Sequence, residues 1–504
     1  MSYISETLST VLAVDPDADV LDYQDTWYSW AQLAGSIAAI SGLLDELGLG
    51  RDSRIGIMVR NRPDAAAAIL AAAARDCCIV TINPMMPKEK LNPDLERLEV
   101  PVVIGEPDDF DRDGVLDVLK KAGSAIIETE PFLQGAHFRD GFDTITGESI
   151  RTTEPGTIIE MLTSGTTGTP KRIPIKRDSF VSAITGALAY EKGRSADDKP
   201  RLRSGTELLS NPLAHIGGMY FILTGILSGR KLCIQDRFTV EGWHHAIVRH
   251  RPKIAGAVPA ALRMILEADI PKEDLESLVA LRSGTAPLDP EIVDEFLRRY
   301  DLPVMGTYGA TEFAGAVSMW RLREFRELWD SKRGSVGTLT PGVEGRVVDP
   351  ESGAELPAGD EGVLELKAGQ IGDGKSWVRT TDRAILDEDG YLFIKGRADN
   401  AIIRGGFKVH PDDVVEILHK HPAVREAVVV GIPDKRLGSV PVAVLMLKDG
   451  ADEPEIDELK TFVKERALPY QVPVQFKFAD DVPRTPSLKP ALPLVREMFL
   501  DEAA

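Results

Sequence analysis

The feature that most constrains the fold is a strand–helix–strand pattern near the start of the chain. Short apolar stretches at residues 54–59 and 78–82 flank an alanine-rich segment, residues 64–74, which Pro63 opens. Proline is favoured in the first turn of a helix, and short apolar stretches are typical of buried strands. Two strands joined by such a helix run parallel in one sheet. We therefore predict an α/β fold, and the alternation continues at residues 100–105 and 124–128.

Other segments show clear periodicity. Residues 27–47 carry apolar side chains at spacings of three and four, which predicts an amphipathic helix. An apolar strand is predicted from residue 208 up to His215, and a strand at 254–258 is followed by a helix at 260–268. Near the C-terminus we predict a short strand at 401–403, a helix at 411–419 and strands at 426–433 and 441–447.

Composition and charge exclude several functions. The chain has 504 residues, of which 43% are hydrophobic and 27% charged, as in an ordinary soluble protein of more than one domain. Its net charge of −20 argues against binding to nucleic acid or anionic membranes. Cys77, Cys78 and Cys233 suggest neither disulfides nor a metal site. With no signal peptide and no apolar run long enough for a membrane span, we expect a cytoplasmic protein.

Residues 161–173, M-L-T-S-G-T-T-G-T-P-K-R-I, predict a phosphate-binding loop. Every residue from Thr163 to Thr169 is Ser, Thr or Gly, and Lys171 follows Pro170. Exposed backbone N–H groups, hydroxyls and a nearby cation suit a polyphosphate. The spacing differs from G-x-x-x-x-G-K-[ST], and a flexible linker is the alternative interpretation. Apolar residues on both sides predict flanking strands, which favours phosphate binding.

This loop, T-S-G-T-T-G-T-P-K, resembles the phosphate loop of the adenylate-forming superfamily, which includes acyl-CoA synthetases, luciferases and peptide-synthetase adenylation domains. The resemblance extends over nearly the whole chain and is closest to the acyl-CoA synthetases. It implies a catalytic role for Thr166 and ATP binding by the whole loop. The loop residues concerned are Thr163, Ser164, Gly165, Thr166, Thr167, Gly168, Thr169 and Lys171.

Residues 208–218, L-L-S-N-P-L-A-H-I-G-G, suggest an acyl-binding segment. A lone histidine is more often structural than catalytic, but the segment resembles the family's P-L-x-H-x-G-G motif. The resemblance implies that His215 borders the acyl pocket and shifts between two half-reactions. The Phe-Asp pair by which peptide-synthetase domains recognise an amine does not follow Pro212, so an amino-acid substrate is disfavoured. The expected substrate-binding residues are His215, Gly218, Met219, Val258, Thr307 and Gly309.

Two segments resemble the family's nucleotide-binding motifs. Residues 281–288, L-R-S-G-T-A-P-L, resemble the S-G-G-A-P-L turn whose backbone lies against adenine, with Thr285 replacing the commoner Gly. In residues 305–313, M-G-T-Y-G-A-T-E-F, a tyrosine can stack on a base and a carboxylate can bind Mg²⁺. The resemblance implies that Tyr308 stacks on adenine, Thr311 contacts the α-phosphate and Glu312 coordinates the metal. Further ATP contacts are expected from Ser283, Gly284, Thr285, Thr307, Gly309 and Ala310.

Residues 377–382 and 396–411 carry the remaining nucleotide motifs and the hinge. W-V-R-T-T-D resembles W-x-x-T-G-D, with Thr381 replacing Gly, and implies that Asp382 binds the ribose hydroxyls. Arg397 falls where the family contacts ribose and phosphate, and Asp399 where its backbone pivots. The implied domains are 1–398, a large domain of mixed and parallel sheets flanked by helices, and 399–504, a small mobile α+β domain. The expected CoA-binding residues are Gly405, Gly406 and Lys408.

Residues 482–492, V-P-R-T-P-S-L-K-P-A-L, resemble the pattern P-R-T-x-S-G-K and imply that Lys489 is the adenylation lysine. A solvated surface lysine is the alternative interpretation. Leu488 replaces the glycine of the pattern. Because glycine turns without a Cβ penalty, we expect Leu488 to impose a different local path.

These motifs together predict an acid–CoA ligase. The enzyme would use ATP and Mg²⁺ to convert a carboxylic acid to an acyl-adenylate and would then transfer the acyl group to CoA. A carrier-protein phosphopantetheine as acceptor, adenylation alone, and an inactive homologue that kept the nucleotide site remain alternatives. The residues expected to line the acyl pocket are mostly small or apolar, so aryl, alicyclic and fatty acids are all compatible with it. The sequence leaves open whether the protein forms a homodimer.

Overall fold

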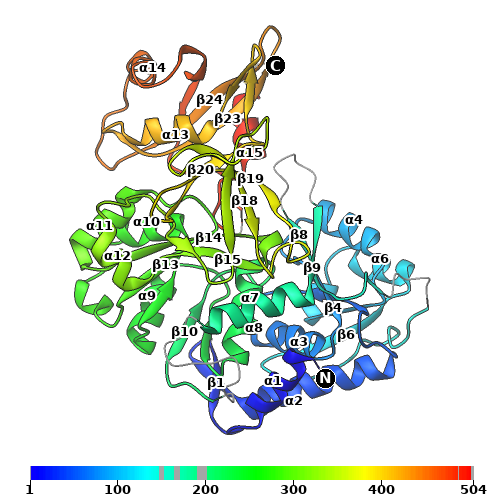
Figure 1. Cartoon of the computed structure of the whole chain (residues 1–504). Helices are drawn as coiled ribbons and strands as arrows, with labels where there is room; N and C mark the ends of the chain where they lie inside the picture. The colour runs from blue at the N-terminus through cyan, green and yellow to red at the C-terminus, as the bar shows by residue number, and fades with distance from the viewer. Residues whose placement is uncertain (1, 147–151, 164–170, 190–200, 486, 501–504) are drawn as a thin grey trace.

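The computed structural model describes residues 2–146, 152–163, 171–189, 201–485 and 487–500. Figure 1 shows a large N-terminal body with a small C-terminal unit above it, and the chain passes between them after β20 (Leu392–Arg397). This arrangement confirms the predicted α/β class with a large and a small part. Within the described ranges, no helix is both long and apolar enough to cross a membrane.

The strand–helix–strand pattern builds a seven-stranded sheet. Its five inner strands pair in parallel, and both edge strands are antiparallel. The helix that joins β3 to β4, α3 (Pro63–Ala74), is buried on every face up to Ala73, which explains why alanine dominates it. In sheet order the strands are β7 (Gly135–Phe138), β6 (Ala125–Glu130), β5 (Val102–Gly105), β3 (Arg54–Met58), β4 (Cys78–Ile82), β8 (Thr157–Thr163) and β9 (Lys171–Lys176).

Three further sheets complete the large part. A four-stranded sheet has the order β10 (Thr206–Leu209), β11 (Lys231–Ile234), β1 (Asp19–Tyr23) and β2 (Thr26–Ser29). A five-stranded sheet has the order β12 (Ile254–Gly256), β13 (Ala280–Ser283), β14 (Val304–Ala310), β15 (Gly315–Met319) and β16 (Thr338–Leu339). An antiparallel sheet has the order β17 (Glu344–Val348), β18 (Glu361–Lys367), β19 (Val378–Leu386) and β20.

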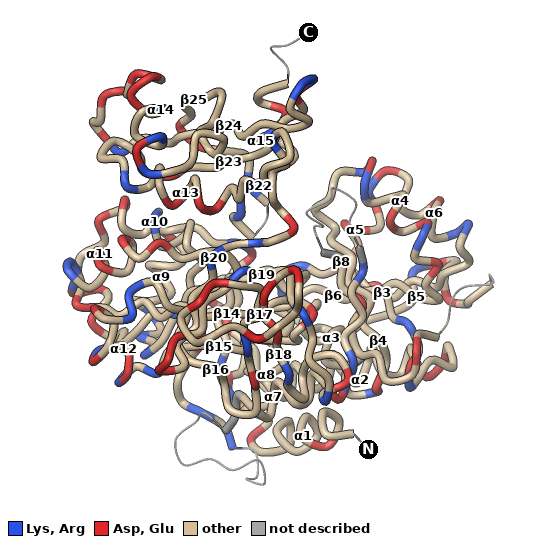
Figure 2. Tube along the Cα trace, turned by 45° about the horizontal axis from the view of Figure 1, so that its top comes forward, with Lys and Arg blue, Asp and Glu red and all other residues tan. Residues whose placement is uncertain are grey.

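Helices pack around these sheets and form the apolar cores with them. The helices of the large part are α1 (Tyr3–Leu12), α2 (Trp30–Glu46), α3, α4 (Lys88–Leu98), α5 (Pro107–Phe110), α6 (Val115–Ala122), α7 (Arg177–Ala189), α8 (Ile216–Leu227), α9 (Val240–His250), α10 (Pro259–Glu267), α11 (Pro290–Tyr300) and α12 (Leu322–Leu328), with the short η1 (Lys272–Leu275) and η2 (Thr311–Phe313). Figure 2 shows basic and acidic residues interspersed along α4, α6, α11 and α12.

Several predicted boundaries are wrong, two of them with clear structural causes or consequences for the site. The helix expected from residue 27 begins at Trp30, because residues 26–29 pair with β1. The start is fixed by a capping box in which Ser29 N–H donates to Gln32 Oε1 at 2.9 Å and Gln32 N–H donates to Ser29 Oγ at 3.3 Å. The strand expected to reach His215 ends at Leu209.

The small unit is one mixed sheet with helices on both faces. Its sheet has the order β22 (Phe407–Val409), β21 (Ile402–Arg404), β24 (Gly438–Leu447) and β23 (Val424–Asp434), and β25 (Phe476–Phe478) pairs with β24. α13 (Pro411–His419), α14 (Ile456–Lys464) and α15 (Leu492–Leu500) cover it, with the short η3 (Pro469–Gln471). α13 lies on the side that faces α10 and β20 (Figures 1 and 2).

Candidate active site

The ends of the predicted phosphate loop are held by an antiparallel pair. β8 and β9 pair from Thr157 with Lys176 to Thr163 with Lys171, so the two flanking strands are confirmed. Residues 164–170, which include Ser164 to Thr169, lie outside the described part of the chain. Their contacts with phosphate therefore stay a prediction, as do those of the Thr163 and Lys171 side chains.

Arg172, beside the loop, anchors β9 to the sheet. Its guanidinium donates to Asp94 Oδ2 at 2.7 Å and to the carbonyl oxygen of Thr81 at 2.9 Å. Burial lowers the pKa of Arg172, and Asp94 opposes that shift. The Arg172 side chain therefore makes structural contacts beside the loop.

His215 caps the N-terminus of α8 in extended conformation. Its N–H donates to the carbonyl oxygen of Pro212 at 2.9 Å. A Cβ at Gly218 would lie 2.3 Å from that same oxygen, so only glycine fits there. Burial and then the charge of Lys489 lower the pKa of His215. The imidazole is therefore neutral at pH 7, and it lies within electrostatic reach of a lysine from the small domain.

Tyr308 and Asp382 join two sheets at the expected nucleotide site. The Tyr308 hydroxyl, at the end of β14, donates to Asp382 Oδ2 on β19 at 2.5 Å. Burial first, and then the Asp382 carboxylate, raise the pKa of Tyr308, so the hydroxyl keeps its proton. Burial raises the pKa of Asp382, and the bond from Tyr308 opposes that shift. A neutral donor thus orients the carboxylate that is predicted to bind ribose.

Arg397 lies beside Asp382, because β19 and β20 pair these two residues directly. Its guanidinium donates to both oxygens of Asp399, at 2.8 and 2.7 Å. This bond chiefly raises the pKa of Arg397, and the charges of Asp382 and Glu312 add to the effect. Glu312 is exposed in η2, against which β9 lies. The predicted metal ligand is therefore close to β9, the strand that follows the phosphate loop.

The other predicted adenine contacts are on neighbouring strands. The Thr307 hydroxyl donates to the carbonyl oxygen of Ser283 at 3.1 Å, and a Cβ at Gly284 would lie 2.5 Å from that hydroxyl. Thr285 has φ +71°, a left-handed conformation that glycine favours. The Thr381 carbonyl oxygen accepts from Ala398 N–H within the β19–β20 region. Thr285 thus keeps a left-handed turn despite its Cβ, whereas Thr381 lies within strand β19 and has no positive φ.

The expectation for Leu488 is wrong. Its φ is +59°, so the loop keeps the left-handed turn that glycine would adopt. For a residue with Cβ this conformation costs about 1–2 kcal/mol. Leu488 N–H donates to the Thr485 carbonyl oxygen, and Thr485 N–H donates to that of Lys489, both at 2.8 Å. The Leu488 side chain packs against an apolar core of the large domain, and this contact offsets the strain.

Lys489 directly follows Leu488 in this turn, next to the side chain that packs against the large domain. It is accessible to solvent, yet the surrounding protein lowers the pKa of its ammonium group, and the charge of Arg397 lowers it further. The charge of Lys489 in turn lowers the pKa of His215, so Lys489 interacts electrostatically with His215 and Arg397 of the large domain.

The residues predicted to bind CoA lie elsewhere on the small domain. Gly405 and Gly406 form the turn between β21 and β22, with φ of +56° and +89°. Positive φ at both positions is typical of two-residue hairpin turns. Both glycines and Lys408 are exposed, and a Cβ at Gly406 would meet no atom within 4 Å. In this orientation the hairpin faces solvent.

The contacts that dock the small domain were not predicted from the sequence. Arg425 Nη1 donates to Glu267 Oε1 at 3.0 Å, and Arg263 Nη1 donates to the Arg425 carbonyl oxygen at 2.6 Å. His419 Nδ1 lies 3.6 Å from Asp289 Oδ2. No local pattern could have identified these partners, because they are far apart in the chain.

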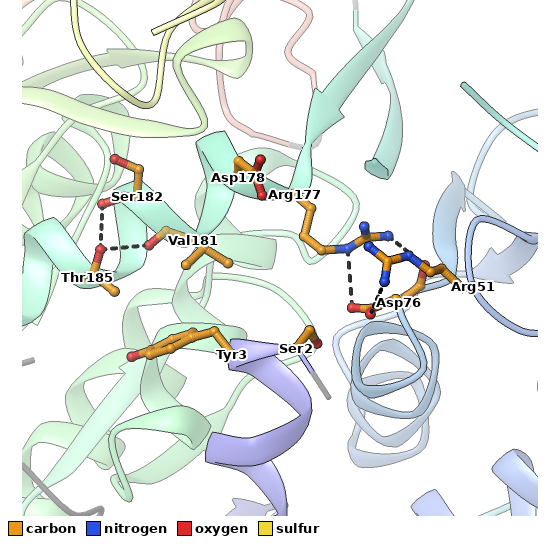
Figure 3. A pocket seen from close by; sticks show the side chains of 9 residues that line it. All are labelled: Ser2, Tyr3, Arg51, Asp76, Arg177, Asp178, Val181, Ser182 and Thr185. Carbon is orange, nitrogen blue, oxygen red and sulfur yellow. Dashed lines mark hydrogen bonds and ion pairs between the residues drawn. The ribbon is translucent and has the colours of Figure 1, made fainter. Parts of the chain in front are cut away.

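A cavity of about 610 Å³ opens between α1 and α7 (Figure 3). Arg177 Nε lies 3.2 Å from Asp76 Oδ1, and Arg51 Nη1 lies 3.9 Å from Asp76 Oδ2, so these three charged groups are paired with one another. None of the described residues that line it is a predicted site residue. We assign it no part in the chemistry.

Asp22, Cys233 and His250 were not foreseen as a group, but their possible ligand atoms lie within 4.8 Å of one another. His250 Nε2 is 2.6 Å from Asp22 Oδ2, and Arg249 Nε is 3.3 Å from the same oxygen. Burial raises the pKa of Cys233 to about 12, which keeps the thiol protonated, whereas metals bind the thiolate. We interpret the group as a buried ion pair.

Comparisons with known proteins identify the family of the chain. A family model described as "AMP-binding enzyme" matches residues 8–374, and one described as "AMP-binding enzyme C-terminal domain" matches residues 414–489. The chain is 26% identical over 484 residues to 4-coumarate–CoA ligase 3 of Oryza sativa subsp. japonica, covering 92% of this chain and 85% of the relative. It is 31% identical over 363 residues to the fatty acid–[acyl-carrier-protein] ligase ScoC of Streptomyces coeruleorubidus, covering 69% of this chain and 68% of the relative.

Solved structures share the fold. ATP-bound MatB from Rhodopseudomonas palustris has a TM-score of 0.81 at 22% identity, covering 99% of this chain and 100% of that one. The o-succinylbenzoate CoA synthetase MenE from Bacillus subtilis, in complex with ATP and magnesium, has a TM-score of 0.76 at 23% identity, covering 97% and 98%. Because the first family model spans more than half of the chain, the protein belongs to the AMP-binding enzymes of the adenylate-forming superfamily.

Proposed function

We propose that this protein is an ATP-dependent acid–CoA ligase. The observation that carries the proposal is the convergence of Lys489, His215 and Arg397 beside the bonded pair of Tyr308 and Asp382. We place the boundary between a large domain, 1–398, and a small mobile domain, 399–504, at the turn that contains Asp399.

The first half-reaction would form an acyl-adenylate. A carboxylate oxygen of the substrate attacks the α-phosphorus of ATP, and the bond to the departing pyrophosphate breaks. An anion here attacks a polyanion, so catalysis requires positive charge more than a base. Lys489 and Arg397 supply that charge, and the neutral His215 borders the acid without repelling the cations. When bound, Mg²⁺ neutralises phosphate charge, and the exposed Glu312 offers oxygen ligands for it.

The second half-reaction would form the thioester. The sulfur of CoA attacks the acyl carbonyl carbon, the bond to AMP breaks, and the thiol proton is lost to solvent. We propose that the turn at Gly405 and Gly406, with Lys408, lines the path of the pantetheine arm after the small domain has rotated about Asp399.

Two alternatives remain open. The acceptor could be a carrier-protein phosphopantetheine, as the name of the ScoC relative indicates for that protein, or the reaction could end at the adenylate. An inactive nucleotide-binding homologue is less well supported, because Leu488 and Thr285 keep the left-handed turns despite replacing glycine.

A panel of carboxylic acids tests the proposal. Purified protein with ATP and Mg²⁺ is given hydroxycinnamic, benzoic, alicyclic and fatty acids, and pyrophosphate release is measured. Each active acid is then tested with CoA and with a phosphopantetheinylated carrier protein. We expect acid-dependent pyrophosphate release and a CoA thioester from at least one acid. Failure with every acid would support the inactive homologue, and a thioester on the carrier protein alone would reassign the acceptor.

Substitutions at Asp382 and Glu312 should affect ATP binding and Mg²⁺ dependence separately. Asp382→Ala removes the carboxylate that Tyr308 orients, so we expect the KM for ATP to rise at least about tenfold, since charged hydrogen bonds contribute about 1.5–3 kcal/mol. Glu312→Gln should instead raise the Mg²⁺ concentration required for half-maximal rate. Steady-state titrations of ATP and Mg²⁺ measure both effects. Unchanged titrations in either variant would remove that residue from its assigned role.

A further inference from the structure

Leu488 belongs to the small domain but packs against the large one. Its side chain contacts the apolar core formed around β12–β14 and the helices α9–α12. Leu488 directly precedes Lys489. In this same orientation Lys489 interacts electrostatically with His215 and Arg397.

The backbone conformation of Leu488 explains why the contact of its side chain matters. A left-handed conformation is unfavourable for any residue with Cβ, and glycine would form the same turn without strain. A leucine at this position is therefore explained by its side chain, whose apolar contact is made with the other domain. When the small domain rotates away, the side chain loses that contact and the strain remains.

A polar network connects the same interface to the Lys489 turn. On α10 of the large domain, Glu267 and Arg263 bind the side chain and the carbonyl oxygen of Arg425. The next residue, Glu426, accepts from Arg484 Nη2 at 2.9 Å, and Arg484 Nη1 donates to the carbonyl oxygen of Leu488 at 3.2 Å. The contacts thus run without a break from α10 to the residue before Lys489.

We propose that Leu488 and Arg425 are positioning residues that hold Lys489 in the site during adenylation, by docking the small domain on α10 and the adjoining core. This inference rests on the proposed acid–CoA ligase activity. It predicts that the docked orientation is favoured in this chain even without substrate. Loss of the contacts should impair adenylation and spare thioester formation.

The activity test compares the two half-reactions. Leu488→Ala and Leu488→Gly both remove the side chain, and Leu488→Gly also removes the backbone strain. Arg263→Ala breaks the interface from the large domain, away from the loop. We expect each variant to slow acid-dependent pyrophosphate release about tenfold, as for loss of one partly buried leucine. Thioester formation from supplied acyl-adenylate should be unchanged or faster.

Two controls separate positioning from folding. Leu488→Met keeps an apolar side chain of similar length and should retain most of the adenylation rate. Leu494→Ala removes an exposed leucine from the same small domain and should alter neither half-reaction. The proposal fails if Leu488→Gly and Leu488→Ala adenylate at the wild-type rate, or if both half-reactions fall by the same factor.

A distance measurement decides the inference even if no acid is turned over. Spin labels on Arg298→Cys and Asp452→Cys report the separation of the two domains, and the native Cys77, Cys78 and Cys233 are buried. We expect one dominant distance in the parent protein and a broader distribution after Leu488→Gly or Arg263→Ala. Unaltered distributions in both variants would overturn the docking role, whereas an inactive parent protein would refute only the proposed function.

Discussion

Replacing Lys489 with alanine should reduce the rate of acyl-adenylate formation by roughly a thousandfold, the effect of removing one preorganised group that stabilises transition-state charge. Its ammonium group is the cation that the small domain adds to the cluster of His215 and Arg397. Thioester formation from supplied acyl-adenylate should survive much better, because that step no longer involves the polyphosphate. Rapid-quench assays of the two half-reactions measure the difference.

Lys464→Ala is the matched control, since it removes an exposed lysine from α14 of the same domain. It should leave both rates unchanged. Equal impairment of the two half-reactions by Lys489→Ala would exclude the assigned role and would point instead to a defect of the whole small domain.

The pH dependence of the adenylation rate provides a second test of the role of Lys489. Adenylation requires the protonated amine, so activity is lost as the pH rises through its pKa. The surrounding protein and then the charge of Arg397 lower that pKa below its ordinary value of 10.5, so the rate should begin to fall below that pH. Lys489→Arg should displace this alkaline limb to higher pH, because guanidinium stays protonated. A limb at the same pH in both proteins would assign the titration to another group.

The sequence predicted well those features whose causes are local. β4 and α13 have the predicted bounds, because short apolar stretches and a proline at the first helical position are local signals. The predicted start of α2 was wrong, although Ser29 and Gln32 have the spacing of a capping box. The apolar period extended the predicted helix into residues that the tertiary fold uses as a strand.

The site was predicted less completely, for a physical reason. Motif resemblance predicted Tyr308, Asp382 and Lys489 as site residues, but it predicted neither the bond between the first two nor the docking of the turn that carries the third. Leu488 illustrates the limit most clearly. Its local preference argues against a left-handed turn, and only the contact with the other domain explains why the turn is kept. Contacts between domains leave no periodic signal in the chain.

The second large effect concerns the turn at Asp399. The structure presents Lys489 to the site while the turn at Gly405 and Gly406 is exposed to solvent. If both serve one active site, the small domain must pivot between the two steps. Asp399 lies in the turn that follows β20, and its φ is not positive, so proline is not excluded there. Asp399→Pro should therefore limit the pivot.

We expect Asp399→Pro to retain part of the adenylation rate and to lose thioester formation by about a hundredfold or more, since proline fixes φ near −65°. Asp399→Ala is the matched control, because it removes the carboxylate bound to Arg397 but leaves φ free. Gly406→Leu should give the same selective loss by obstructing the pantetheine path, although a side chain there meets open space in the present orientation. Acyl transfer to CoA at the normal rate in both Asp399→Pro and Gly406→Leu would show that the two steps do not depend on domain rotation. Equal losses in Asp399→Pro and Asp399→Ala would instead assign the effect to the ion pair with Arg397.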